Sequence, residues 1–399
     1  HQLMYRAIGE LSEKGMPCDA VTLGEWFDAQ GLAESVGGTR YVLELANSTP
    51  SAANIVAYAE IVREKSVLRQ LIDAGMEITG DGFRPEGRSS QELVESAEQK
   101  VFQIAEAGSR GRQGFVPMRS AVKEAFRLLQ ERYESRSPIT GLPTGFNDLD
   151  YKTAGLQAGD LIIIAARPSM GKTALSLNIA EYAAIKTGKA AAVFSMEMSS
   201  SQLAFRLISS LGRINQQHLR TGELADEEWP RVTSAITMLS EAKIFIDDTP
   251  SLSPLELRAR ARRLKREHDL GLIVVDYLQL MQVPGNKENR ATEISEISRS
   301  LKALARELGV PVIALSQLNR SLEQRTDKRP VMADLRESGA IEQDADVIVF
   351  IYRDEYYNPE SNEKGIAEII IGKQRNGPTG TVKLTFLGQY TRFENFANE

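Results

Sequence analysis

The feature that most constrains the fold is an alternation of short apolar runs with helical stretches after about residue 141. Six runs have the length of buried strands: residues 161–166, 191–194, 244–246, 272–275, 312–315 and 347–351. Helical patterns separate them, and the clearest begins at a capping box with proline at its second residue, Ser253 to Glu256. Buried strands separated by helices predict a mostly parallel sheet that helices cover on both faces. Two later runs, 367–371 and 381–386, predict an antiparallel end to this sheet.

The first 105 or so residues show apolar residues at helical spacing and predict an all-α domain. Thr22–Glu25 is a candidate capping box and Gly31 a candidate helix end. A long helix is expected after Pro50, and another is expected to start at Ser89–Glu92. The long helix carries an apolar stripe, which we expect to pack in a core: Ile55, Tyr58, Val62, Leu68, Leu71 and Ile72. The pattern is already helical at His1, without an N-cap, which indicates that helical turns before it are missing.

A linker is expected between the two halves. Residues 108–114 are rich in glycine and break the helical pattern. Residues 121–133 then form an amphipathic helix that has no core of its own, so we expect it to dock on its own chain or on a neighbouring subunit. The sequence thus predicts a helical N-terminal domain at 1–105, a linker with a docking helix at 106–140, and an α/β domain at 141–399.

Composition excludes several classes of protein. No run of about 18 apolar residues occurs among the 399, so no membrane-spanning helix is expected. The single cysteine, Cys18, excludes an intrachain disulfide and a cysteine-rich zinc site and favours a cytoplasmic location. The net charge of −6 argues against a broad basic face for nucleic acid, so any such contact must be local.

A phosphate loop follows the first apolar run. Gly171-Lys172-Thr173 lies between this run and a helical pattern, which is the context that a phosphate-binding loop requires, although Ala166 replaces the usual first glycine. Backbone N–H groups would surround the phosphates, Lys172 would reach the β- and γ-phosphates, and Thr173 would ligate Mg²⁺. The predicted ATP-binding residues are Arg167, Pro168, Ser169, Met170, Gly171, Lys172 and Thr173.

Three polar residues follow other apolar runs, at the edge where parallel strands end. Asp276 is expected to help hold the Mg²⁺ ion. Glu197 is expected to orient or deprotonate the attacking water. Gln317 either bonds the γ-phosphate or is an ordinary loop amide. ATP and Mg²⁺ are therefore the predicted cofactors.

Six segments, in order, closely resemble the motor domain of DnaB-type replicative DNA helicases. They are residues 166–173, 195–198, 274–280, 315–320, 334–346 and 373–380, and 334–346 is the most specific to that family. The resemblance covers 141 to 399, and the helical front half is similar to that family's N-terminal domain. It implies a RecA-like motor that forms a homo-hexameric ring, with ATP between neighbours.

The resemblance also assigns residues. Arg375 resembles an arginine finger that reaches into the neighbour's ATP site, with Lys373 beside it, and a guanidinium there would stabilise developing charge. Arg336, Glu337 and Gly339 match a loop that holds single-stranded DNA in the channel. Arg336 can pair with phosphate through its side chain, whereas Glu337 and Gly339 can only offer backbone N–H groups.

Further expectations follow from the family. The helix at 121–133 resembles one that packs on the next subunit. The resemblance also implies that the ring moves 5′ to 3′ on the encircled strand. Primase and a helicase loader are the partners that it implies. A basic run on the helix before Asp276 is interpreted as a solvated or subunit-interface face rather than as a DNA site: Arg258, Arg260, Arg262, Arg263, Lys265 and Arg266.

Two other functions are compatible with a phosphate loop. One is a different RecA-like ATPase that acts on DNA, such as a strand-exchange recombinase, although the lone cysteine excludes relatives with an N-terminal zinc module and residues 334–346 favour the helicase. The other is a ring or loader scaffold that binds ATP only for assembly. The presence of Lys172, Glu197 and Arg375 gives that alternative no support.

Overall fold

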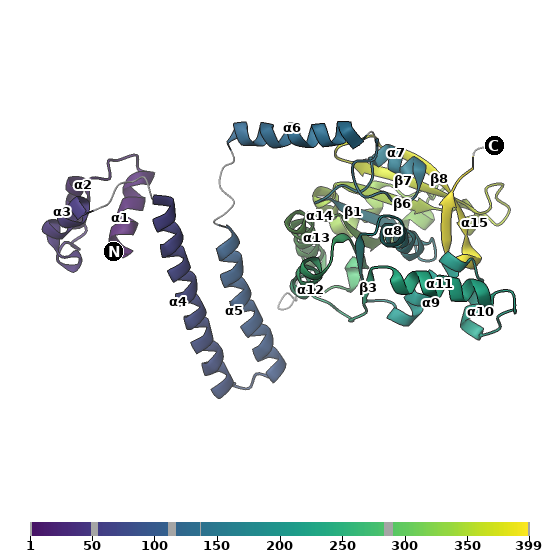
Figure 1. Cartoon of the computed structure of the whole chain (residues 1–399), viewed down its shortest axis with the longest axis horizontal. Helices are drawn as coiled ribbons and strands as arrows, with labels where there is room; N and C mark the ends of the chain where they lie inside the picture. The colour runs from purple at the N-terminus through teal and green to yellow at the C-terminus, as the bar shows by residue number, and fades with distance from the viewer. Residues whose placement is uncertain (1, 49–54, 111–116, 136, 283–289, 398–399) are drawn as a thin grey trace. The chain divides into compact units, whose positions relative to one another are not determined.

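The computed structural model describes residues 2–48, 55–110, 117–135, 137–282 and 290–397 (Figure 1). The chain divides into two compact units, His1–Lys123 and Glu124–Glu399. None of the helices in the described ranges is long and apolar enough to cross a membrane.

The first unit begins with three helices and a short 3₁₀ turn around a small core. These are α1 (Gln2–Glu13), α2 (Ala20–Ala29), η1 (Glu34–Val36) and α3 (Gly38–Ser48). The buried core residues are Met4, Ala7, Leu11, Leu23, Phe27, Val36 and Val42.

The predicted capping box at Thr22–Glu25 is wrong by one helical turn. The N-cap is Asp19, whose Oδ1 accepts hydrogen bonds from the backbone N–H groups of Val21 (3.0 Å) and Thr22 (2.8 Å). Thr22 is therefore the third helical residue rather than the cap. Both residue types can cap a helix, and the chain enters α2 at the aspartate. The predicted end is close to the observed one, because Gly31 has φ +67° just after the helix.

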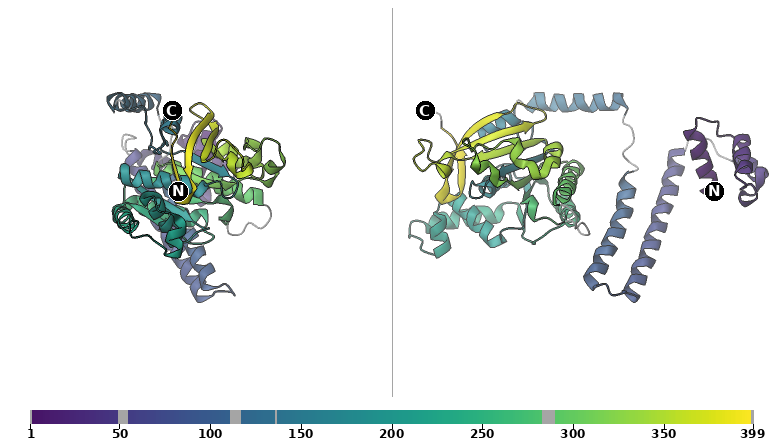
Figure 2. Two further views of the ribbon diagram at one scale, coloured as in Figure 1. Left: turned by 90° about the vertical axis from the view of Figure 1, so that its right-hand side faces the viewer. Right: turned by 180° about the vertical axis from the view of Figure 1, so that it is seen from behind.

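Two long helices, α4 (Ile55–Phe83) and α5 (Ser90–Arg110), lie side by side as a hairpin (Figures 1 and 2). The predicted start of α5 is confirmed, since the Glu92 carboxylate accepts hydrogen bonds from the backbone N–H (2.6 Å) and hydroxyl (2.9 Å) of Ser89. The predicted linker at 108–114 is only partly right. Its first three residues continue α5, and residues 111–116 lie outside the described ranges.

The expectation that the α4 stripe forms a core is wrong for the single chain. The six stripe residues, from Ile55 to Ile72, are between 41% and 64% exposed. Among the side chains that the structure describes on α4, only Ala74 is buried. One neighbouring helix cannot cover a 29-residue helix, so an apolar surface remains for another partner.

The predicted docking helix is α6 (Met118–Ser135), and all of its described side chains are exposed. Its apolar residues include Val122 (59% exposed), Phe126 (66%), Leu129 (63%) and Tyr133 (85%). The predicted helix is thus present, and its apolar side is free in the single chain.

The second unit contains a nine-stranded sheet with the order β3-β2-β4-β5-β1-β6-β7-β8-β9. The strands are β1 (Leu161–Ala166), β2 (Ala190–Ser195), β3 (Ile244–Asp247), β4 (Leu270–Asp276), β5 (Val312–Gln317), β6 (Val347–Tyr352), β7 (Ile366–Gln374), β8 (Gly380–Leu387) and β9 (Arg392–Asn395). Pairs among β1 to β6 are parallel, and β7, β8 and β9 extend β6 in antiparallel fashion. The predicted α/β fold and its antiparallel end are confirmed.

Helices cover both faces of this sheet. One face carries α8 (Lys172–Lys186), α9 (Ser200–Gly212) and α7 (Asn147–Thr153), and the other carries α12 (Pro254–Glu267), α13 (Arg290–Leu308) and α14 (Gly339–Asp344). Successive residues of β1 alternate between the two buried clusters, as the two-residue period of a strand requires. The remaining elements are short or peripheral: α10 (Gln216–Thr221), α11 (Trp229–Glu241), η3 (Leu278–Leu280), η4 (Arg320–Gln324), η5 (Met332–Ser338), α15 (Asp354–Tyr357) and η6 (Gly388–Tyr390).

The parallel strands define two edges of the sheet. The carboxyl edge is formed by the last residues of β1, β2, β4 and β5, and the register places Ala166 beside Gln317 and Ser195 beside Asp276. The amino edge lies at the start of the same strands, where Leu161 follows Asp160. Ligands of such sheets bind at the carboxyl edge.

Candidate functional site

The phosphate loop connects β1 to α8 at the carboxyl edge. Its single glycine, Gly171, has φ +101°, and a Cβ there would lie 2.9 Å from Cζ of Phe393. A larger residue would be strained and would also clash, so glycine is required at this position. Ser169 adopts a left-handed backbone as well, with φ +64°. The Met170 side chain is 1% exposed and belongs to the core, so this residue can offer a ligand only its backbone.

Thr173 and Asp276 meet as the sequence predicts. The Thr173 hydroxyl donates a hydrogen bond of 2.8 Å to Oδ2 of Asp276, which is 2% exposed. Burial raises the pKa of Asp276, while the Thr173 hydroxyl and the Lys172 charge oppose that rise. Its Oδ1 is buried and has no hydrogen-bond partner among the described residues. A hydroxyl beside an unsatisfied carboxylate oxygen is a donor set that suits Mg²⁺ and its water shell.

Lys172 is the first residue of α8 and faces two carboxylates. Burial lowers the pKa of its ammonium group, and the negative charges of Asp276 and Glu197 counter this effect. Glu197 is exposed and lies two residues after the end of β2. Gln317 is the last residue of β5, beside the end of β1. The structure therefore brings the four predicted residues together at the carboxyl edge.

Arg167 belongs to the loop but its side chain turns away from it. Nε bonds Oε1 of Glu323 at 2.7 Å, and Nη1 donates to the carbonyl of Leu318 at 2.8 Å. The side chain is 8% exposed. Arg167 thus anchors the loop to the segment after β5, and only its backbone is available to a phosphate.

Arg206 of α9 is a site residue that sequence reasoning missed. Burial lowers its pKa, while the charges of Asp276 and Glu197 raise it, so the guanidinium faces both carboxylates. Its Nε is buried and lacks a hydrogen-bond partner among the described residues. A lone arginine in an amphipathic helix looks like a surface residue, and only the packing of α9 on α8 places it here.

We expect Arg206→Ala to lower kcat for ATP hydrolysis about 100-fold, as for the loss of one preorganised charge at a reacting phosphate. The measurement is phosphate release over a range of ATP concentrations. Arg206→Lys keeps the charge without the planar fork and should recover part of the rate. An alanine variant with wild-type kcat would exclude Arg206 from the site.

A second missed residue, Arg353, holds the phosphate loop from the far side. Its Nη1 donates to the carbonyl of Ser169 at 3.1 Å, and its Nη2 bonds Oε1 of Glu355 at 2.5 Å. The guanidinium also stacks on Phe386, 4.1 Å from the ring centroid. These contacts hold the left-handed backbone at Ser169, and the Ser169 N–H group is not used by them.

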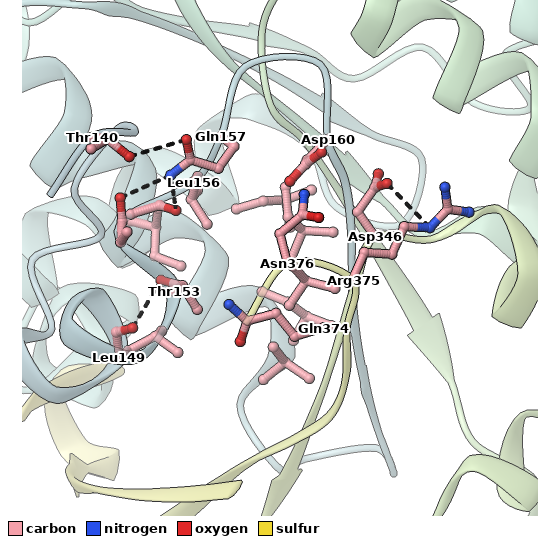
Figure 3. A pocket seen from close by; sticks show the side chains of 18 of the residues that line it. Thr140, Leu149, Thr153, Leu156, Gln157, Asp160, Asp346, Gln374, Arg375 and Asn376 are labelled. Atoms are coloured by element: carbon pink, nitrogen blue, oxygen red, sulfur yellow. Dashed lines mark hydrogen bonds and ion pairs between the residues drawn. The ribbon is translucent and has the colours of Figure 1, made fainter. Parts of the chain in front are cut away.

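Arg375 lies at the amino edge beside Asp346 (Figure 3), and Lys373 pairs with Ile348 near the start of β6, so both are far from this loop. Nε of Arg375 is 3.5 Å from Oδ1 of Asp346, the residue just before β6. The six residues of β1 separate the two edges by about 17 Å at the rise of a parallel strand. The structure thus does not bring Arg375 to the Lys172 of its own chain.

A cavity of about 480 Å³ lies beside Arg375 at this amino edge (Figure 3). Apolar side chains such as Leu156, Ile164 and Ile179 line it together with Gln374. None of the predicted ATP-binding residues lines it. This cavity is therefore distinct from the phosphate loop.

The predicted DNA-binding residues lie at the junction of η5 and α14. The backbones of Arg336 and Glu337 belong to η5, but their side chains lie outside what the structure describes. Gly339 is the first residue of α14 and is exposed. The basic run on α12 is largely paired: both Arg258 and Arg262 bond Glu307 of α13.

These features define a class: a nucleotide-binding motor with a RecA-like sheet, and with a phosphate-loop motif beside a buried aspartate at the carboxyl edge. Family models narrow it further, because that for the DnaB-like helicase C terminal domain matches residues 141–395 and that for the DnaB-like helicase N terminal domain matches residues 1–64. The chain belongs to the DnaB-like helicase family.

Individual relatives are similar in sequence to this protein over almost its whole length. Replicative DNA helicase DnaB of Haemophilus influenzae is 51% identical over 100% of this chain and 86% of its own length. Replicative DNA helicase DnaC of Bacillus subtilis is 49% identical over 99% of this chain and 87% of its own length. The function is ATP-driven unwinding of DNA in replication, which sets aside the recombinase and scaffold alternatives.

Two solved structures resemble this one. A DnaB-like replicative helicase, described with its interactions with primase, has a TM-score of 0.78 and 35% identity over 98% of this chain and 91% of that chain. A separately solved ATPase domain has a TM-score of 0.67 and 43% identity over 69% of this chain and 99% of that domain.

Proposed function

We propose that this helicase hydrolyses ATP at sites shared between neighbouring copies in a homo-hexameric ring, with single-stranded DNA in the channel. The observation that carries the proposal is the position of Arg375 at the amino edge, away from the phosphate loop of its own chain. A finger that cannot reach its own ATP must serve another copy. Head-to-tail contacts of this kind form a closed ring when the rotation between copies closes, which is the arrangement that we propose.

In each site, one chain supplies the phosphate-binding half. The backbone of residues 167–171 and the start of α8 surround the phosphates, and Lys172 reaches the β- and γ-phosphates. Thr173 and Asp276 would hold Mg²⁺, which neutralises charge on the phosphate oxygens when bound. Binding of ATP and Mg²⁺ thus needs no residue beyond those at the carboxyl edge of one chain.

Four further residues complete the reaction. Glu197 orients the attacking water and accepts its proton. Gln317, at the end of β5, contacts the γ-phosphate and registers its loss. Arg375 and Lys373 enter from the neighbour and stabilise charge on the transferred phosphoryl group. Hydrolysis in one subunit then depends on the position of the next.

The DNA is held through its phosphates. Arg336 pairs with a phosphate through its side chain, whereas Glu337 and Gly339 donate backbone N–H groups. Contacts of this kind carry no sequence information, as a motor that passes over any sequence requires. ATP binding orders the loop on DNA, and hydrolysis lets the subunit detach and rebind further along in the 5′ to 3′ direction. Enclosure of the strand by the ring replaces much of the affinity that a broad basic face would supply, and this fits a protein with a net charge of −6.

Exposed apolar surfaces support assembly. The free side of α6 needs a partner, and α9 and α11 present exposed apolar side chains that could receive it from a neighbour: Phe205 (47%), Trp229 (54%), Ile236 (46%) and Met238 (39%). The exposed stripe of α4 offers a second contact in the N-terminal half. Primase and a helicase loader are the further partners that we propose, and the exposed free Cys18 fits a cytoplasmic location.

Removal of the DNA contact tests the DNA half of the proposal. We expect Arg336→Ala to weaken binding of single-stranded oligonucleotides equally for all sequences, since a phosphate contact is lost. The slope of log affinity against log salt should fall by about 0.7 for each phosphate released. The measurement is fluorescence anisotropy with dT and mixed-sequence oligonucleotides over a salt series, followed by unwinding of a forked duplex.

Arg263→Ala is the matched control. Arg263 lies in the basic run of α12 and forms an exposed ion pair with Glu267 one turn away, so its loss should leave affinity and unwinding unchanged. An equal loss of DNA affinity in both variants would show that α12 also contacts DNA. An Arg336→Ala protein with wild-type DNA affinity would show that Arg336 does not contact DNA.

A further inference from the structure

The short helix α14 connects the predicted DNA loop to the basic pair at the amino edge. Its first residue is Gly339 of the DNA loop. At its other end, Nζ of Lys373 donates to the carbonyl of Glu342, and Nη2 of Arg375 donates to the carbonyl of Gln343 at 2.7 Å. One six-residue helix thus touches both groups.

The contact at the end of α14 has a general physical cause. The last carbonyls of a helix have no partner within the helix, and the helix dipole makes this end attractive to cations. Lys373 also donates to the carbonyl of Ala345 at 2.7 Å, one residue beyond the helix. The basic pair therefore caps α14, and its side chains must respond when the end of α14 moves.

The geometry favours transmission along the helix over bending within it. Six residues span only about 9 Å. Ile341, in the middle, is fully buried in the core against α13 and the sheet, and Asp344 accepts a hydrogen bond from Ser298 of α13. The backbone N–H of Arg375 donates to the carbonyl of Asp346 at 2.9 Å, so the base of the finger is fixed to the start of β6. The backbone of Arg375 is therefore held in place, and it is the side chain of this residue that can follow α14.

We propose that α14 is the element that couples DNA bound at Gly339 to the placement of Lys373 and Arg375 in the neighbour's ATP site. The inference rests on the proposed function and adds a route for the stimulation of ATP hydrolysis by DNA. The coupling is reciprocal: engagement of the basic pair by the neighbour's nucleotide tightens the hold of the same subunit on DNA.

Ala340→Gly tests the route, because it loosens α14 between its two contacts without removing either of them. We expect the ATPase rate without DNA and the affinity for a dT oligonucleotide to stay at the wild-type level. The stimulation of ATPase by that oligonucleotide should fall about fivefold, within the range of a lost coupling between sites. Ala259→Gly, the same change at an exposed position of α12, should leave the stimulation unchanged.

Amide hydrogen exchange on the assembled protein gives an independent measurement. The N–H of Ala345 donates to the carbonyl of Ile341 at 3.0 Å and so reports the end of α14, whereas the N–H of Arg375 reports its fixed contact with Asp346. The dT oligonucleotide should therefore change the exchange of Ala345 in the wild type and leave that of Arg375 unchanged. The change should be absent in Ala340→Gly. This readout does not require the variant to hydrolyse ATP, and the wild-type result alone is decisive if the variant does not assemble.

Two outcomes overturn the proposal. One is undiminished DNA stimulation in an assembled Ala340→Gly protein, and the other is no effect of DNA on the exchange of Ala345 in the wild type. Failure of the underlying function has a different signature. In that case, the wild type shows no DNA stimulation at all, or Arg375→Ala hydrolyses ATP at the wild-type rate.

Discussion

Lys172→Ala is expected to lower kcat for ATP hydrolysis about 10²–10³-fold, the usual cost of removing one preorganised charge from a site where negative charge develops. Lys172 is positioned by the start of α8, and its Nζ lies 5.4 Å from the ring centroid of Tyr277. It faces the carboxylates of Asp276 and Glu197, and burial of its ammonium group makes a phosphate partner more favourable. The measurement is phosphate release at saturating ATP, with and without single-stranded DNA.

Lys186→Ala is the control for this change. Lys186 lies in the last turn of the same helix and is exposed, so its removal tests loss of a lysine from α8 without loss of the site. It should retain the wild-type rate, and both variants should unfold at the wild-type temperature. A Lys172→Ala protein that keeps more than about a tenth of the rate would show that the phosphates are held elsewhere.

The carboxyl edge was predictable because its signals are local in the sequence. The strands β2, β4 and β5 are apolar runs rich in Val, Ile, Leu and Ala, and Asp276, Glu197 and Gln317 come at or just after the end of such a run. Parallel strands end at one edge, so these residues had to meet once the sheet was parallel. The Ser253 capping box is local in the same sense and is confirmed.

Arg206 and Arg353 could not be found in this way, because their partners are distant in the sequence. Arg353 reaches Ser169 across 184 positions, and no periodicity encodes that contact. Arg167 shows the converse: its place in the loop motif suggested a ligand, but its side chain bonds Glu323. Motif position fixes the backbone, whereas side-chain direction depends on packing.

The exposed stripe of α4 shows a second limit of prediction from the sequence. Amphipathic spacing shows that one side of a helix is apolar, and it does not show which chain covers that side. Ile55 and Val62 are as periodic as any core residues, yet they are 62% and 64% exposed. Sequence reasoning assigned them to a core within the chain, while it left the partner of α6 open. In the structure, both α4 and α6 present an apolar side that the described residues of the chain do not cover.

Arg375→Ala is the second large effect that we expect, a loss of about 10³-fold or more in ATPase rate, because arginine fingers contribute that much in related ATPases. Binding of ATP should change little, since Arg375 lies at the amino edge and the phosphate loop of its own chain is intact. The measurement is phosphate release together with binding of a fluorescent nucleotide. Arg266→Ala, at an exposed position of α12, is the control and should keep both properties.

Mixing of variants decides whether the ATP sites are shared. Lys172→Ala and Arg375→Ala are each expected to be inactive, but in a mixed ring some interfaces combine the intact phosphate loop of one with the intact finger of the other. Random assembly in a closed ring would give about one such interface in four, so the mixture should recover activity that neither variant has alone. Mixing of either variant with Arg266→Ala controls for dilution and subunit exchange. If exchange is demonstrated and the two inactive proteins stay inactive together, each chain contains its whole site, and Arg375 acts only on its own fold.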